Sequence, residues 1–222
     1  NFTAAIESLT DLYAVRENFL QYHREIVFST KYNNTVSVEQ QNSPLTMGGK
    51  GLTNPTQNLA DAFGMANGKG INEPGSGYDE DHPYVGRDPR FYMTFAYDGS
   101  EFTVNDKTQT IETFEGGKDA TATNKTATKT GYYLKKLLSP QAVWDGRTNN
   151  ITRTWILMRY AEVLLNYAEA MNEYCESPSQ APNDSIYKVV ELIRKRAELS
   201  PYKLPAGLTK EEMREVIRNE RR

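Results

Sequence analysis

The residues best suited to binding chemistry are aromatic side chains that lie among amides and charged groups. Trp144 occurs in a polar loop, with Arg147 three residues later and Asn149 and Asn150 just beyond it. An indole ring has a flat apolar face that can stack on the axial C–H face of a sugar, while neighbouring polar groups bind the hydroxyls. The alternative is that Trp144 packs its loop onto the core.

Two other tyrosine-containing segments offer the same combination of groups. Tyr78 and Tyr84 flank an acidic turn in a stretch rich in Gly and Pro, and Tyr32 precedes Asn33 and Asn34. Together with Trp144 and Arg147, these residues are our candidates for glycan contacts, each with core packing or solvation as its alternative.

The acidic turn consists of Asp79, Glu80 and Asp81. Clustered carboxylates can hold calcium through oxygen ligands, but the ligand spacing of an EF-hand is absent here. A solvated acidic turn is the alternative to a calcium site. General acid–base catalysis would require a cleft and a shifted pKa, and the sequence indicates neither, so we predict no catalytic residues.

Composition excludes several other classes of function. The 222 residues include 26 Lys and Arg against 29 Asp and Glu, a net charge of −3 that does not fit a nucleic-acid-binding protein. Only two histidines, His23 and His82, and one cysteine, Cys175, are present. A His-rich zinc site and an internal disulfide are therefore excluded, and we predict no metal ligands of this kind.

The chain divides into three zones by composition. Residues 1–24 are predicted to form a helix from a preceding repeat, and residues 25–150 a loop-rich glycan-binding segment with short strands. Residues 151–222 are predicted to form helical repeats of the tetratricopeptide type. The predicted fold is thus mainly α, an alpha-alpha superhelix packed with a long irregular segment that carries short β-hairpins.

Two ordered elements are expected inside the loop-rich segment. Thr56–Met65 is predicted to be a short helix. Alternating aromatic and apolar residues over Phe91–Tyr97 predict a strand, which Asp98-Gly99 would join to Glu101–Val104 in a hairpin.

Helical periodicity dominates the last zone. Thr154–Tyr174 is predicted to be one helix, with Trp155 on its buried face, and Ser185–Leu199 is predicted to be the next. A third helix is predicted to begin at a capping box, Thr209 with Glu212. Its apolar stripe, Met213 and Ile217, is expected to be exposed or covered by another copy.

Six segments, in order, resemble motifs of the SusD/RagB family of surface glycan-binding lipoproteins. They are Pro55-Thr-Gln-Asn-Leu-Ala-Asp-Ala-Phe63, Gly86-Arg-Asp-Pro-Arg-Phe-Tyr92, Gly131-Tyr-Tyr-Leu-Lys-Lys136, Arg159–Glu173, Arg194-Lys-Arg-Ala-Glu-Leu199 and Ile217-Arg-Asn-Glu-Arg-Arg222. Glu198 departs from the pattern, because the family has Gly there. The motif arginines lie beside many carboxylates, so we expect structural ion pairs and no phosphate site.

The resemblance implies a function of binding and delivery without catalysis. Members of the family are about twice this length, so the chain resembles a fragment. It would be part of a lipoprotein of the outer membrane in Bacteroidetes, anchored by an N-terminal lipid on the extracellular face. It would bind an oligosaccharide or polysaccharide and deliver it to a TonB-dependent, SusC-like transporter. The first alternative is a tetratricopeptide-like protein-interaction module without sugar binding. The second is a helical glycoside-processing enzyme.

Overall fold

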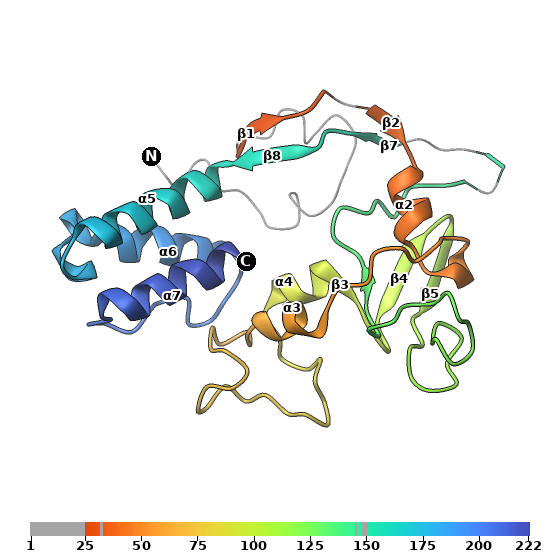
Figure 1. Cartoon of the computed structure of the whole chain (residues 1–222), viewed down its shortest axis with the longest axis horizontal. Coiled ribbons are helices and arrows are strands. Elements are labelled where there is room, and N and C mark those ends of the chain that lie inside the picture. Colours follow the sequence, from red (N-terminus) through yellow and green to blue (C-terminus); the bar gives the residue numbers. More distant parts are fainter. Residues whose placement is uncertain (1–24, 32, 145, 148–150) are drawn as a thin grey trace.

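Two layers of different character make up the structure (Figure 1). The computed structural model describes residues 25–31, 33–144, 146–147 and 151–222. One layer contains three helices, α5 (Tyr160–Tyr174), α6 (Ser185–Arg196) and α7 (Lys210–Arg221), with short 3₁₀ turns at Pro178–Gln180 and Pro182–Asp184. The predicted helix over residues 1–24 lies outside the described residues.

The other layer is rich in loops and carries only short elements. They are α2 (Ser37–Asn42), a 3₁₀ turn (Leu45–Met47), α3 (Gln57–Ala62), α4 (Pro89–Thr94), β3 (Phe95–Ala96), β4 (Glu101–Val104), β5 (Lys107–Thr110) and β6 (Tyr133–Leu134). Of these, α3 confirms the short helix predicted after Pro55, and the Thr56 hydroxyl caps it by accepting from the Leu59 N–H.

The helical layer has a continuous apolar core. α5 packs against both α6 and α7, and the buried cluster includes Leu164, Ile186, Met213 and Ile217. The expectation that the Met213 and Ile217 stripe is exposed or covered by another copy is wrong, because α7 turns back along α5 (Figure 1). The predicted capping box of α7 is confirmed. That the helices continue as repeats stays a prediction.

The first helix of this layer begins later than predicted. Residues before Tyr160 form two strands, β7 (Ile151–Arg153) and β8 (Ile156–Arg159), which pair antiparallel with β2 (Asn33–Thr35) and β1 (Ile26–Ser29). Trp155, expected in the core, is 48% exposed between the two strands. Its backbone exchanges hydrogen bonds with Thr30, so strand pairing replaces the helical turn that would have buried it.

The predicted strand over Phe91–Tyr97 is also corrected. The Asp88 side chain accepts from the Arg90 N–H at 2.8 Å, and Pro89 occupies the first helical turn, so α4 begins there. Only Phe95 and Ala96 are extended, and they pair with β6.

In the described part of the chain, a hairpin forms at a different turn from the one predicted. β4 and β5 are joined by Asn105 and Asp106, which both have positive φ, at 56° and 55°. Asn and Asp tolerate this left-handed conformation, which a tight two-residue hairpin turn requires. Asp98-Gly99 instead connects β3 to β4, strands that belong to different sheets.

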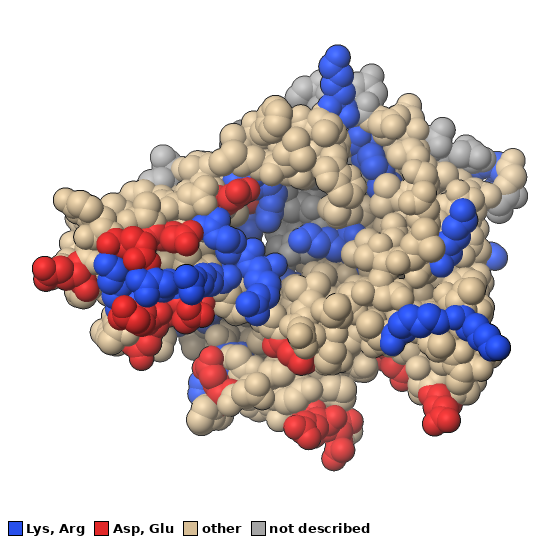
Figure 2. Space-filling model, viewed as in Figure 1, with Lys and Arg blue, Asp and Glu red and all other residues tan. Residues whose placement is uncertain are grey.

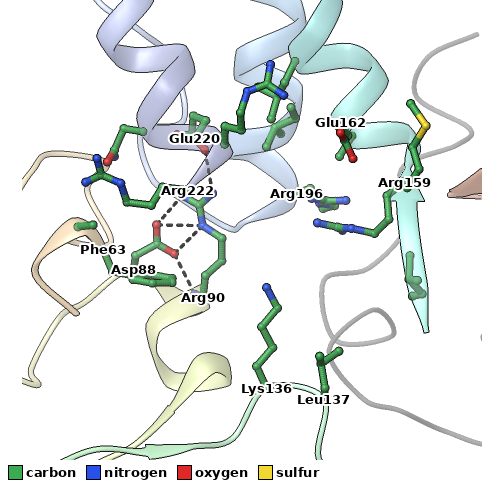
Figure 3. A pocket seen from close by; sticks show the side chains of 18 of the residues that line it. Phe63, Asp88, Arg90, Lys136, Leu137, Arg159, Glu162, Arg196, Glu220 and Arg222 are labelled. Carbon is green, nitrogen blue, oxygen red and sulfur yellow. Dashed lines mark hydrogen bonds and ion pairs between the residues drawn. The ribbon is translucent and has the colours of Figure 1, made fainter. Parts of the chain in front are cut away.

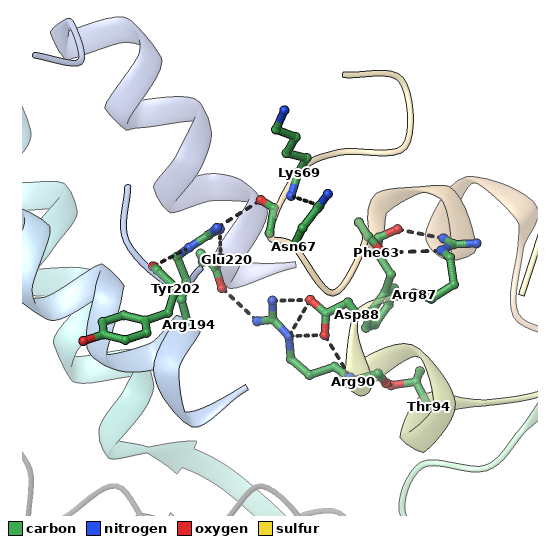
Figure 4. A network of polar contacts seen from close by, with 12 residues as sticks. Phe63, Asn67, Lys69, Arg87, Asp88, Arg90, Thr94, Arg194, Tyr202 and Glu220 are labelled. Carbon is green, nitrogen blue, oxygen red and sulfur yellow. Dashed lines mark hydrogen bonds and ion pairs between the residues drawn. The ribbon is translucent and has the colours of Figure 1, made fainter. Parts of the chain in front are cut away.

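A buried ionic network joins the two layers (Figure 4). Arg90 of α4 contacts Asp88 at 2.6 Å and Glu220 of α7 at 2.8 Å. Arg194 of α6 contacts the other oxygen of Glu220 at 3.1 Å and donates to the Gly68 carbonyl. The four charged residues come from three of the segments that resemble family motifs. The expectation of structural ion pairs is confirmed for Arg90 and Arg194.

No helix in the described part of the chain is long and apolar enough to cross a membrane.

Candidate functional site

Trp144 is held in one orientation by two hydrogen bonds. Its N–H donates to Asn105 Oδ1 at 2.8 Å, and its indole Nε1–H donates to the Gly48 carbonyl at 3.0 Å. The half-buried ring also packs against the apolar core of the loop-rich layer, which includes Phe102 and Tyr133. One side of Trp144 thus packs its loop onto the core, and the remainder of the ring is accessible, so contact with a sugar stays a prediction.

The turn between β4 and β5 positions the groups around this ring. The Asn105 N–H donates to the Ala142 carbonyl at 2.8 Å, and its Nδ2 donates to the Met47 carbonyl at 3.3 Å. Gly48 has a φ of +86°, and a Cβ there would lie 3.4 Å from Nε1 of Trp144. Asn105 therefore ties together three loops that are distant in the sequence.

An exposed ion pair lies on the same hairpin turn. Arg147 Nη2 contacts Asp106 Oδ2 at 2.9 Å, and both side chains are exposed. We call Gly48, Asn105, Asp106, Trp144 and Arg147 the Trp144 site. A fixed indole with a guanidinium and a carboxylate nearby offers a stacking face together with donors and acceptors for hydroxyl groups.

The sequence singled out Trp144 and Arg147 as candidates, but it did not single out Asn105, Asp106 or Gly48, which lie beside them in this candidate site. The available signal was the Asn-Asp pair between two alternating segments, which is typical of a tight hairpin turn. That this turn would meet the Trp144 loop could not be read from local sequence.

The asparagines of the early strand are engaged elsewhere. Asn33 and Asn34 lie in β2 with exposed side chains, and Asn34 Oδ1 accepts from the Thr152 hydroxyl at 2.6 Å. Neither takes part in the hydrogen bonds that hold Trp144. Tyr32 lies outside the described residues.

Tyr84 belongs to a second aromatic cluster, and Tyr78 contacts Arg87, whose guanidinium also lies over Phe91 of that cluster. The Tyr84 ring lies 4.4 Å from that of Tyr97, centroid to centroid, and packs against a core that contains Phe91. Burial raises the pKa of Tyr84 well above its usual range. The Tyr78 ring faces the Arg87 guanidinium at 5.5 Å. The Tyr84 cluster and the core beneath Trp144 are distinct, so the predicted rings do not form one site.

The residues of the acidic turn form hydrogen bonds with one another. Asp79 contacts His82 Nδ1 at 2.8 Å and accepts from the Asp81 N–H at 3.0 Å. These hydrogen bonds hold the pKa of Asp79 below its usual value. Within the described ranges, no three His, Cys, Asp or Glu side chains are grouped to hold a metal ion, so Asp79, Glu80 and Asp81 do not assemble the alternative calcium site.

A cavity of about 540 Å³ lies between the two layers. Figure 2 shows lysine and arginine side chains gathered around a hollow at this place, and Figure 3 shows Lys136, Arg159 and Arg196 pointing toward it. Its wall includes Trp155 and Leu157, which the sequence placed on a helix. We call it the interlayer cavity; no pattern in the sequence predicted it.

Solved structures with the same architecture come from Bacteroides fragilis NCTC 9343. One is a SusD-like protein with 26% identity and a TM-score of 0.69, and the match covers 98% of this chain and 44% of that chain. The second is a SusD-like carbohydrate-binding protein with 22% identity and a TM-score of 0.66, covering 96% and 43%. The chain thus spans less than half the length of either. No curated protein matches the sequence.

The family model agrees with these structural matches. The model of the SusD family matches residues 19–222, which is most of the chain. Three of the motifs that suggested this family supply the charged residues of the network between the layers, Asp88, Arg90, Arg194 and Glu220. The chain therefore belongs to the SusD family.

Proposed function

We propose that this protein binds a glycan at the Trp144 site without cleaving it. The observation that carries the proposal is the half-exposed indole of Trp144, fixed by Asn105 and Gly48 beside the exposed pair of Asp106 and Arg147. A ring that is already ordered loses little conformational entropy on binding, which favours recognition of flexible saccharides. The similar SusD-like carbohydrate-binding protein from Bacteroides fragilis supports this choice of ligand.

A purely binding role is supported by the carboxylates as well. Glycoside hydrolysis requires a carboxylic acid whose pKa is raised so that it can protonate the leaving group. Hydrogen bonds lower the pKa of Asp79, Glu173 and Glu212, which is the opposite of the shift that such an acid needs. Incubation with starch, plant and mucin polysaccharides should therefore release no reducing ends.

The proposal extends to the setting of the whole protein. We place it at the extracellular face of the outer membrane, held by an N-terminal lipid, where it delivers its glycan to a TonB-dependent, SusC-like transporter. In this arrangement the helical layer is the scaffold that faces the transporter, and the loop-rich layer carries the glycan. Membership in the SusD family is the support for this arrangement.

A glycan array followed by titration tests the binding role. The array identifies a neutral oligosaccharide ligand, and calorimetry then compares the wild type with Trp144→Ala. Loss of a stacking ring costs about 1–3 kcal/mol, by analogy with base–aromatic stacking, so we expect tenfold to hundredfold weaker binding. Unchanged affinity in Trp144→Ala would exclude the Trp144 site. Binding of peptides alone, with no glycan hit, would favour the protein-interaction alternative.

A further inference from the structure

The ribbon formed by β1 and β8 carries several exposed apolar side chains. Figure 1 shows this ribbon between the helical layer and the loop-rich layer. Val27 and Phe28 of β1 are 52% and 61% exposed. On the other strand, Leu157 is 52% exposed, and Trp155, which directly precedes β8, is 48% exposed. Large apolar side chains gathered on one short ribbon indicate a surface that another element covers.

A ribbon of two strands needs a further packing partner. Two paired strands alone are marginally stable in water, and a helix packed on the ribbon supplies the missing apolar contact. Among the described elements, β1 contacts mainly β8, and the two strands form a sheet of their own. Trp155 and Leu157 both line the interlayer cavity, so the uncovered apolar surface continues into it. The element that covers the ribbon therefore lies against this cavity.

The chain enters the ribbon at a fixed point. The Glu25 carbonyl accepts from the Tyr160 N–H at 2.7 Å, where α5 begins. The Glu25 carboxylate contacts Arg159 at 3.2 Å and Arg196 at 2.6 Å, and both arginines line the interlayer cavity. Residue 24 is one peptide unit from Glu25, so the segment that precedes β1 ends beside the wall of this cavity.

The sequence of residues 1–24, which lie outside the described part of the chain, fits an element that is covered on two sides. One apolar stripe at helical spacing consists of Phe2, Ile6, Leu9, Tyr13 and Leu20. A second stripe, spaced by three and four residues, consists of Leu12, Val15, Phe19 and Tyr22. At about 100° per residue, the two stripes are roughly 130° apart around a helix. Such a helix is suited to burial between two partners, which a position between the layers provides.

We propose that residues 1–24 form a helix that packs on the ribbon of β1 and β8 and inserts side chains of its second stripe into the interlayer cavity. A helix of this length is about 36 Å long and about 10 Å across, so it is larger than the cavity of about 540 Å³, and only its side chains enter. The short connection before Ile26 turns the helix back along β1. The cavity is then the seat of a segment of this chain.

The lengths of the two elements place particular residues opposite one another. A helix rises about 1.5 Å per residue and a strand about 3.3 Å. Distances are counted from the last residue of the second stripe and from the last residue of β8. Phe19 then lies about 4.5 Å along the helix and Leu157 about 7 Å along the ribbon, whereas Val15 and Trp155 lie at about 10 Å and about 13 Å. We therefore expect Phe19 to meet Leu157 and Val15 to meet Trp155.

Disulfide cross-linking of the full chain tests this packing. Cys175→Ala first removes the single native thiol. Phe19→Cys combined with Leu157→Cys should then form an intramolecular disulfide on mild oxidation. Gln21→Cys combined with Leu157→Cys is the matched control, because Gln21 lies about 160° around the helix from Phe19, and it should form none. Equal yields for the two pairs, no disulfide for the Phe19 pair in folded protein, or disulfide-linked dimers alone would each overturn the proposal.

Melting temperatures test the same contact without new thiols. Phe19→Asp places a charge in the apolar contact, and we expect the melting temperature to fall by about 5–10 °C. Gln21→Asp introduces the same charge on the polar side of the helix and should leave the melting temperature nearly unchanged. Equal melting temperatures for the two variants would contradict the proposal. None of these residues belongs to the Trp144 site, so both tests are independent of glycan binding.

Discussion

The helical layer and the loop-rich layer are stabilised in different ways. In the helical layer, residues at helical spacing on α5, α6 and α7 bury one apolar core, and its members come from a single stretch of about one quarter of the chain. In the loop-rich layer, the core around Trp144 draws on residues from Val36 to Ile151, and side-chain hydrogen bonds to backbone groups hold its loops in place.

Under the proposed function, this difference separates a scaffold, the helical layer, from a recognition surface, the loop-rich layer. Periodic helices bury their apolar side chains in one another, whereas irregular loops can leave a ring such as Trp144 half exposed and still fix its orientation. Binding residues commonly lie on loops positioned by a rigid scaffold. The Glu220 network connects the two layers, and it is therefore the most direct place to break the arrangement.

Removal of the Glu220 carboxylate should have the largest effect. The Glu220 side chain is 3% exposed and binds both Arg90 and Arg194. Glu220→Ala leaves two buried guanidinium groups without this partner, and we expect a loss of about 3–5 kcal/mol in the free energy of unfolding. Urea unfolding measures it, with Glu215→Ala on the exposed face of α7 as the control. Similar urea midpoints for Glu220→Ala and Glu215→Ala would show that the Glu220 network does not stabilise the contact between the two layers.

Replacement of Asn105 should destabilise the loop-rich layer and leave the helical layer unaffected. Asn105→Ala removes the acceptor for the Trp144 N–H and the donor to the Met47 carbonyl, so we expect a loss of about 1–3 kcal/mol. Neutral glycan binding should weaken as well, because Trp144 loses its fixed position. Asp106→Asn keeps a residue that tolerates the turn and removes only an exposed pair, so its stability should change little. Equal stabilities for the two variants would contradict the positioning role of Asn105.

Glu198 offers a smaller, stabilising change in the helical layer. It follows α6 with a φ of 62°, at the position where the family motif has Gly. A left-handed conformation costs a residue with a Cβ about 1–2 kcal/mol, so Glu198→Gly should raise the free energy of unfolding by about 1 kcal/mol. Ala197→Gly, at a φ of −72°, should instead destabilise. Thermal unfolding of both variants checks the sign, and destabilisation by Glu198→Gly would contradict this explanation of the family's glycine.

The smallest expected effect depends on pH. The hydrogen bond from Arg214 lowers the pKa of Glu173 below its ordinary value of 4.5. A carboxyl whose pKa is lower in the folded state stabilises the fold above its unfolded pKa, and this contribution disappears as the pH falls through the folded pKa. Glu173→Gln should therefore melt slightly below the wild type at pH 7, and the difference should shrink as the pH is lowered through the folded pKa. A difference that did not shrink on acidification would rule out this ionic contribution.

Local sequence signals predicted the helical layer well. The Thr209 and Glu212 capping box marks the start of α7 as predicted, and the apolar stripe of α6 faces the core. The errors arose where tertiary pairing overrides periodicity. Trp155 fits a helical stripe, but β7 and β8 pair with strands more than a hundred residues earlier, and that pairing cannot be read from local spacing.

The candidate site was predictable only in part. Trp144 and Arg147 were identified from composition, because rings among polar groups indicate binding. Asn105 reaches Trp144 only because the hairpin turn folds back onto a loop 39 residues later. Tyr84 has the same local composition as Trp144, yet it packs into the Phe91 cluster, so composition alone could not separate the two.

The most direct test of the account compares the two tryptophans in one titration with a neutral glycan identified by the array. We expect Trp144→Ala to weaken binding tenfold to a hundredfold, and Trp155→Ala, in the interlayer cavity, to leave it unchanged. Melting temperatures measured on the same samples separate loss of binding from loss of folding. Normal affinity in a folded Trp144→Ala protein would contradict the claim that the loop-rich layer binds glycan at the Trp144 site.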